Sequence, residues 1–143
     1  MSFSNTFETG LLALIFNATT LTNIADNAAS APLTDLYVAL HTADPTDSGT
    51  QSSSEATYTS YARVAVARTS GGWTVSGDTV DNTAQIAFPE ATGGSNTITH
   101  FSVGYASSGA TTIIMHGALT SSLAVSNGIT PTFAIGALTA TLD

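Results

Sequence analysis

The sequence predicts an all-β fold, a jelly-roll-like β-sandwich of about eight strands with a short N-terminal helix. Three observations support this prediction. Hydrophobic residues make up 43% of the 143 residues and charged residues only 8%, which favours a folded chain over a disordered one. From residue 35 onward, apolar side chains recur at every second position, as in strands. Clusters of Gly, Asn, Asp and Pro separate these short stretches, and we expect one domain over residues 1–143.

The first segment is predicted as a helix that ends near Asn17. Asn5 can cap it, and Glu8 can reach back in a variant of the capping box. Its apolar residues recur at helical spacing and form one stripe: Phe7, Leu11, Leu14 and Ile15. This stripe exceeds what one edge of a small sandwich needs to cover. We therefore interpret the four residues as a candidate interface with a neighbouring subunit or an underlying shell, with residues 1–34 as helix and arm.

The clearest strand follows at residues 35–41, where Leu36, Val38 and Leu40 share one face. The longest strand is expected over residues 58–68, and the Asn-Gly pair at 127–128 predicts a tight hairpin. Further strands are expected around residues 73–75, 84–88, 101–105, 113–115, 123–125, 133–135 and 138–142. The residues expected in the core are Leu36, Val38, Leu40, Val64, Val66, Ile86, Phe88, Phe101, Val103, Ile113, Phe133 and Leu138.

Charge excludes two classes of partner. Ten acidic residues face two arginines and no lysine, giving a net charge of −8. Nucleic-acid binding and attraction to anionic membranes both require clustered cations, so neither partner is expected. The longest apolar run, residues 11–16, is far too short to span a bilayer. No cationic start of a signal peptide is present, so we expect synthesis in a cytoplasm without an export signal.

No catalytic, cofactor-binding or metal residues are predicted. The chain has no Cys, and no Gly-x-Ser-x-Gly motif surrounds any serine. His41, His100 and His116 lie far apart and beside apolar strand positions, which favours a structural interpretation over a zinc site. Asp44 and Asp47 follow His41 but lack the alternating acids and final Glu of an EF-hand loop.

The two cations, Arg63 and Arg68, are predicted on opposite faces of one strand. With ten acids available, both are expected to pair with carboxylates. Two interpretations remain open for them, namely a surface ion pair or a cross-strand or cross-subunit clamp, and we include both arginines in the candidate interface. A surface of Thr, Ser, Ala and Gly loses little side-chain entropy on burial, which favours an assembly component.

Several segments together resemble a family of small phage virion proteins that are commonly labelled tail-fibre proteins. They are LYVALHTADP at 36–45, YARV at 61–64, Trp73, IAFP at 86–89, THF at 99–101 and GITP at 128–131. Related small jelly-roll proteins serve as trimeric cement or decoration proteins on phage heads. The resemblance implies no catalytic or metal residues.

Residues and resemblance together favour a capsid decoration or cement protein that bridges and stabilises major capsid subunits. It is expected as a homotrimer on the outer capsid surface of the virion, made in the host cytoplasm and without a cofactor. The alternative is a tail-associated structural protein, either a tail fibre or an adaptor. A second alternative is a carbohydrate-binding module, based on Trp73 and on tyrosines expected to be exposed.

Overall fold

The computed structural model describes residues 4–21 and 32–142, which form two compact units. Of the described residues, the first unit combines 4–21, 32–35, 66–86 and 133–142, and the second combines 36–65 and 87–132. The described residues contain one helix and nine strands, so the all-β fold with a single helix is confirmed. The jelly-roll arrangement and the single domain stay predictions, and residues 22–31 of the predicted arm lie outside the described residues.

Helix α1 of the first unit spans Asn5–Asn17, and the prediction that Asn5 caps it is wrong. Ser4 is the cap, because its backbone is extended and its hydroxyl accepts a hydrogen bond from the Phe7 amide at 3.4 Å. The helix ends at Ala18, which adopts the left-handed conformation at φ 52°. The helix therefore begins one residue after the side chain that caps it.

The buried face of α1 differs from the predicted stripe. Leu12 and Phe16, one turn apart, are the buried apolar residues of the helix, and Glu8 lies buried one turn earlier. The ring of Phe16 packs edge-on against Trp73, with centroids 5.0 Å apart. The four predicted stripe residues, Phe7, Leu11, Leu14 and Ile15, are half-buried. Their role as interface residues stays a prediction.

A three-stranded antiparallel sheet completes the first unit, in the order β3 (Trp73–Ser76), β4 (Thr79–Asn82) and β9 (Thr139–Thr141). Helix α1 packs against β3 and β4. The buried amide of Asn82 donates to the carbonyls of Ala84 and Ala134 and accepts from the Leu138 amide, each at 2.8 Å. This amide joins the end of β4 to the chain that leads into β9.

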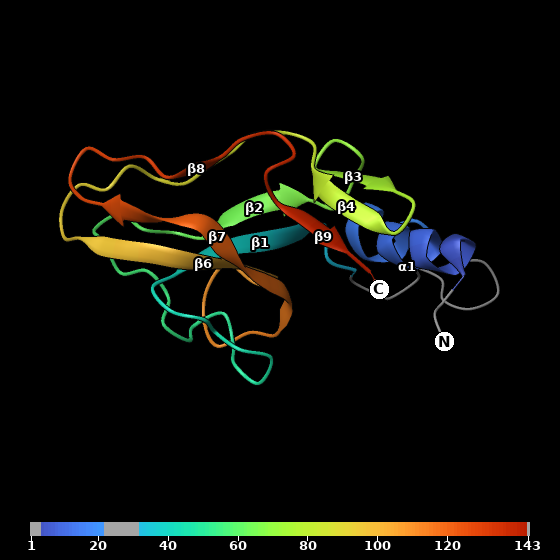
Figure 1. Cartoon of the computed structure of the whole chain (residues 1–143), viewed down its shortest axis with the longest axis horizontal. Coiled ribbons are helices and arrows are strands. Elements are labelled where there is room, and N and C mark those ends of the chain that lie inside the picture. The colour runs from blue at the N-terminus through green and yellow to red at the C-terminus, as the bar shows by residue number, and fades with distance from the viewer. Residues whose placement is uncertain (1–3, 22–31, 143) are drawn as a thin grey trace. The chain divides into compact units, whose positions relative to one another are not determined.

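The larger sheet has the strand order β2 (Val64–Ala67), β1 (Asp35–His41), β6 (Asn96–Gly104) and β7 (Ile113–Val125). Strands β1, β6 and β7 lie side by side in Figure 1, and both pairs are antiparallel. From Leu36 to His41 every residue of β1 except Tyr37 is buried, so this strand is covered on both faces. Strand β7 occupies one edge of the sheet.

Two strand predictions are wrong. The expected strand over residues 58–68 shrinks to β2, because the chain before it turns at Ser60, whose φ is 79°, after the buried ring of Tyr58. The hairpin expected at residues 127–128 does not pair with β7. Instead the amide of Gly128 donates to the Ala91 carbonyl, and the amide of Ala91 donates to the Ile129 carbonyl. The longest strand is β7, and β5 (Ile86–Ala87) pairs with β8 (Thr132–Phe133).

Most of the predicted core is confirmed. Eight of the twelve residues are buried, with Val38 and Val103 completely inaccessible to solvent. The remaining four are half-buried, and predicting them as core was wrong: Val64, Phe101, Ile113 and Phe133. For Ile113 the reason is its place on β7, which has a paired neighbour on one side only among the described residues.

Candidate functional site

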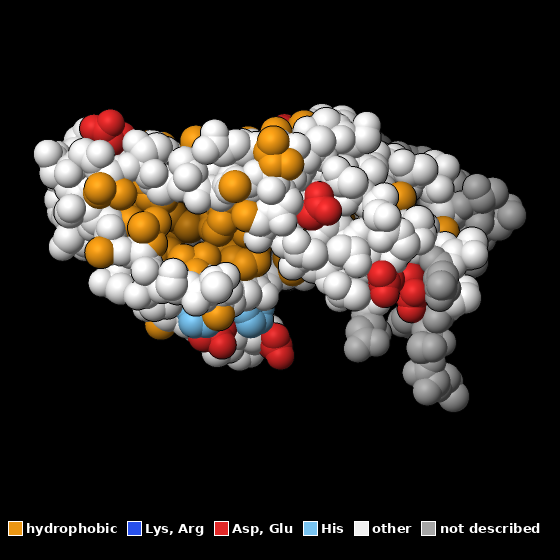
Figure 2. Space-filling model, turned by 45° about the horizontal axis from the view of Figure 1, so that its top comes forward, with side chains coloured by type: hydrophobic (Ala, Val, Ile, Leu, Met, Phe, Trp, Pro, Cys, Tyr) orange, Lys and Arg blue, Asp and Glu red, His pale blue; other side chains and the backbone are white. Residues whose placement is uncertain are grey.

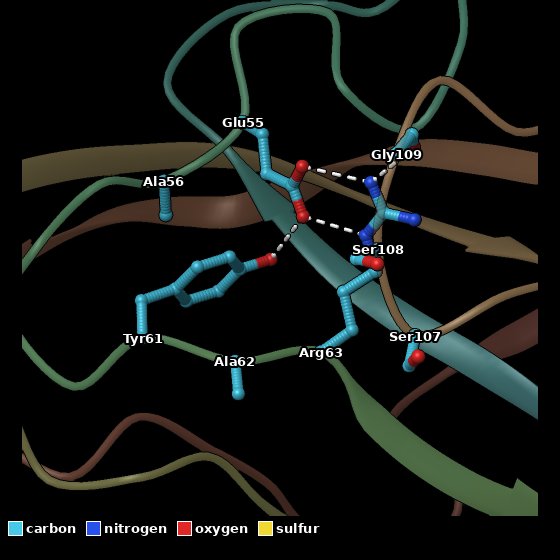
Figure 3. A pocket seen from close by; sticks show the side chains of 8 residues that line it. All are labelled: Glu55, Ala56, Tyr61, Ala62, Arg63, Ser107, Ser108 and Gly109. Carbon is cyan, nitrogen blue, oxygen red and sulfur yellow. Dashed lines mark hydrogen bonds and ion pairs between the residues drawn. The ribbon is translucent and has the colours of Figure 1, made fainter.

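The most buried charge in the second unit is the guanidinium of Arg63, whose side chain is 1% exposed. Its Nε donates to Glu55 Oε1 at 2.6 Å, and an Nη2 hydrogen is donated to Oε2 of the same carboxylate at 2.8 Å. Figure 3 shows this two-pronged contact. Such bidentate pairing fixes the orientation of both side chains and is stronger than a neutral hydrogen bond.

The remaining N–H groups of Arg63 reach the loop that joins β6 to β7. They donate to the carbonyl oxygens of Ala106 at 3.0 Å and Gly109 at 2.8 Å, and to Gln51 Oε1 and Thr111 Oγ1 at 3.3 Å. A guanidinium has five N–H groups, and all are engaged by these acceptors and Glu55. Arg63 therefore clamps the loop after β1 to the loop after β6.

Gln51 connects this clamp to strand β1. Its amide nitrogen donates to the Tyr37 carbonyl of β1 at 2.8 Å, and its oxygen accepts from Thr111 at 2.9 Å. The side chain lies directly against Gly104, where a Cβ would stand 2.3 Å from the Gln51 amide. Glycine is therefore required at position 104 for this buried amide to reach both partners.

Tyr61 completes the cluster. Its hydroxyl donates to Glu55 Oε1 at 3.0 Å and accepts from the Leu40 amide at 3.0 Å. Burial raises the pKa of Tyr61 well above its usual value, so the phenol stays neutral. The ring stacks against Phe88 and meets Tyr58 edge-on, which ties the polar cluster to the aromatic core of this unit.

A pocket of about 270 Å³ lies over the clamp and is shown in Figure 3. It is lined by Glu55, Ala56, Tyr61, Ala62, Arg63, Ser107, Ser108 and Gly109. The guanidinium has no N–H left for a bound anion, and the phenol is held neutral between the carboxylate and a backbone amide. The geometry therefore supports a structural clamp within one chain, the cross-strand alternative left open for Arg63.

Arg68 contradicts the expectation of a carboxylate partner. In the first unit it donates to three carbonyl oxygens at 2.7 Å each, those of Leu14, Ile15 and Leu33. The physical reason is the C-terminal end of α1, where carbonyls lack helical partners and the helix dipole favours a cation. Arg68 thus binds the end of the helix to the chain that leads into β1.

The three histidines have different environments. His41 is 0% exposed: its Nδ1 donates to the Ser53 carbonyl at 2.8 Å, and its Nε2 accepts from the Ser102 hydroxyl at 2.7 Å. Burial lowers the pKa of His41, which keeps the ring neutral. The Nδ1 of His100 is hydrogen-bonded to the Thr99 hydroxyl at 2.9 Å. These surroundings fit the structural interpretation of the sequence.

His116 of β7 lies beside the two aspartates that follow β1. Its Nδ1 is 3.3 Å from Asp44 and its Nε2 is 3.0 Å from Asp47. This contact could not be predicted from sequence spacing, because the residues lie about seventy positions apart. The aspartates use opposite ring nitrogens and do not converge on one point. Among the described residues, no group of three His, Asp or Glu side chains could hold a metal ion.

Trp73 is 0% exposed in the core of the first unit. A sugar-binding platform requires an accessible aromatic face, so the carbohydrate-binding alternative loses the residue on which it was mainly based. Of the tyrosines, Tyr58 is buried and Tyr61 lies within the clamp. Tyr105 is exposed to 45%.

One surface feature was not predicted. No Asp, Glu, Lys or Arg occurs between Glu90 and Asp143, so β6, β7, β8 and β9 carry no formal charge. Of the four large hydrophobic side chains that are exposed among the described residues, three fall in this stretch, namely Tyr105, Ile129 and Ile135. Figure 2 shows hydrophobic side chains gathered in a hollow over the region of β7 and β8. The uncharged stretch is visible in the sequence alone, because no Asp or Glu lies between Glu90 and Asp143.

The comparison with protein families gives one match over almost the whole chain. The family model described as podophage GP4 fiber I protein gp80 matches residues 2–141. No curated protein matches the chain. In the part of the chain that the structure describes, no helix is long and apolar enough to cross a membrane.

Proposed function

Since the chain belongs to the family of podophage GP4 fiber I protein gp80, and is thus a structural protein of a phage virion, we propose that it is a subunit of a tail-associated fibre. The observation that carries this proposal is the extent of the match, which includes both compact units. The protein acts through assembly and performs no catalysis. The saturated hydrogen bonds of Arg63 and the buried ring of His41 support this part of the proposal.

The proposed partners are further copies of the chain, as a homotrimer, and one other virion protein. A trimer fits the closed rotational symmetry that is usual for homo-oligomers. The uncharged stretch from residue 91 to 142 supports self-association, because a chain with a net charge of −8 repels its own copies wherever carboxylates meet. No ion has to be desolvated when such surfaces are buried.

A second candidate function is capsid decoration, with the protein as a cement that bridges major capsid subunits. It is favoured by the short chain without internal repeats, since fibre shafts are usually long and repetitive. A compact subunit bound in many copies to a shell would need only weak individual contacts, because several contacts per trimer combine.

Quantitative mass spectrometry of purified virions separates the two functions. A fibre subunit is expected at a copy number comparable with that of the other tail proteins. A copy number comparable with that of the major capsid protein would instead support decoration and overturn the proposal for the tail. Gold-labelled antibodies against the chain, viewed by negative-stain electron microscopy, should mark the tail in the first case and the head in the second.

A further inference from the structure

Strand β7 is the unprotected edge of the larger sheet. It runs over thirteen residues and, among the described residues, pairs with β6 only. Exposed edge strands are normally blocked by charges, by proline or by their short length, because free backbone groups otherwise attract other chains. Strand β7 contains no Asp, Glu, Lys, Arg or Pro. Charge, proline and short length are therefore absent as protections on β7, while its pairing with β6 contains two register shifts.

The side chains of β7 are suited to a protein contact. Leu119 and Leu123 are half-buried, and the residues between them, Thr120, Ser121 and Ser122, are exposed. The hydrophobic hollow in Figure 2 lies over the same region of the molecule. Small hydroxyl residues next to partly covered leucines lose little conformational entropy when a second surface covers them.

We infer that β7, with the hollow beside it, is the surface through which copies of this chain contact each other around the symmetry axis of the oligomer. This inference rests on the self-association in the proposed function and names the surface that performs it. A symmetry axis brings identical residues close together, so a strand beside it must not bring like charges together. Residues 117–125 of β7 satisfy this condition, because Asp44 and Asp47 lie beside His116, nearer the start of the strand. Strands β1 and β4, in contrast, carry Asp35 and Asp81.

The length of β7 sets the width that an interface with a second copy needs. Thirteen residues of extended strand span at most about 44 Å at roughly 3.4 Å per residue. A stable protein interface buries roughly 800 Å² per partner, which over this length requires a band about 18 Å wide, formed by β7 together with the hollow beside it. The acids Asp44 and Asp47 lie beside His116, so the neutral part of this band is residues 117–125. There the negative charge of the chain does not oppose a second copy.

The test introduces like charges on β7 and compares them with the same change elsewhere. In the double variant Thr120→Lys and Ser122→Lys, two cations per copy would meet their own counterparts at the axis. The control is Ala65→Lys together with Ala67→Lys, two exposed positions of the short edge strand β2. Mass is measured by light scattering coupled to size-exclusion chromatography, and circular dichroism checks that both variants remain folded.

We expect the natural chain and the β2 variant to be oligomers and the β7 variant to be a monomer with an unchanged spectrum. An intact oligomer in the β7 variant, or dissociation of the β2 variant alone, would overturn the inference. A natural chain that is monomeric at every concentration would overturn it together with the proposed self-association. A dimer that the β7 variant dissociates would contradict the proposed trimer but support the surface.

Discussion

The two outer strands of the larger sheet differ in length and in the charged residues that flank them. Strand β2 has four residues and is flanked by both cations of the chain, Arg63 and Arg68. Strand β7 has thirteen residues and no formal charge. Each arginine is directed inward, one to a carboxylate and loop carbonyls and the other to a helix end. The chain thus uses its only two cations to fix segments of its own fold and leaves the other edge neutral.

The largest effect is expected when the clamp beside β2 is broken. Arg63→Met removes the cation that pairs with Glu55 and the donor to the carbonyls of Ala106 and Gly109, while Tyr61 and Thr111 still donate to Glu55 and Gln51. Removal of one partner of a buried ion pair typically costs about 3–5 kcal/mol, and we expect a loss of this size in the free energy of unfolding. Urea denaturation measures it, with Arg63→Met combined with Glu55→Gln as the matched variant that should recover part of the loss. A loss below about 1 kcal/mol would show that the clamp is not structural.

A smaller effect is expected from Arg68→Met. The guanidinium stabilises the C-terminal end of α1 through the carbonyls of Leu14 and Ile15, and charge-assisted hydrogen bonds contribute about 1.5–3 kcal/mol each before solvent screening. Because Arg68 is half-buried, we expect a net loss of about 1–2 kcal/mol. The helical signal in circular dichroism should weaken on heating before the β signal. Simultaneous loss of both signals at the natural midpoint would contradict this role.

His41, on the inner strand β1, makes the free energy of unfolding depend on pH. Burial holds the folded-state pKa of His41 below its usual value of 6.5, so the unfolded chain takes up a proton more readily than the folded chain. The contribution of neutral His41 is therefore complete above about pH 6.5 and is lost as the pH falls toward the lowered pKa. The free energy of unfolding should decrease between about pH 7 and pH 5, and His41→Asn should flatten this slope. An equal slope in both proteins would assign the dependence to other groups.

The smallest effect on folding is expected on β7 itself. Ser122→Lys changes an exposed side chain, so the free energy of unfolding should stay within about 0.5 kcal/mol of the natural value. Denaturation is measured at a protein concentration too low for self-association. The result is then the free energy of unfolding of the single chain. A loss above about 2 kcal/mol would place Ser122 in the fold of the single chain and weaken the distinction between the two edges.

Local patterns predicted the elements that local forces determine. The alternation of Leu36, Val38 and Leu40 correctly indicated β1, and the helical spacing indicated α1. The side of α1 that is buried was predicted wrongly, because Leu12 and Phe16 also lie one turn apart and tertiary packing against Trp73 chose between the two stripes. Which face of a helix is buried depends on the elements that pack against it as well as on its own sequence.

The candidate site could be predicted only in part. The scarcity of cations indicated that each arginine would be engaged, but the acceptors of Arg63 lie in loops about ten and about forty-five positions away. Backbone carbonyls have no sequence signature, so the partners of Arg68 could not be predicted from residue types. The length of β7 was underestimated because Thr120, Ser121 and Ser122 are typical of turns. The absence of charge after Glu90, in contrast, is visible in the sequence alone.

Amide hydrogen exchange shows directly whether copies of the chain meet at β7 and not at β2. The amide protons of residues 113–125 are followed in the natural protein and in the variant with Thr120→Lys and Ser122→Lys. We expect slower exchange along β7 in the natural protein than in the variant, and equal exchange of residues 64–67 in both. Equal exchange along β7 in both proteins, with slowed exchange at another surface, would contradict this expectation.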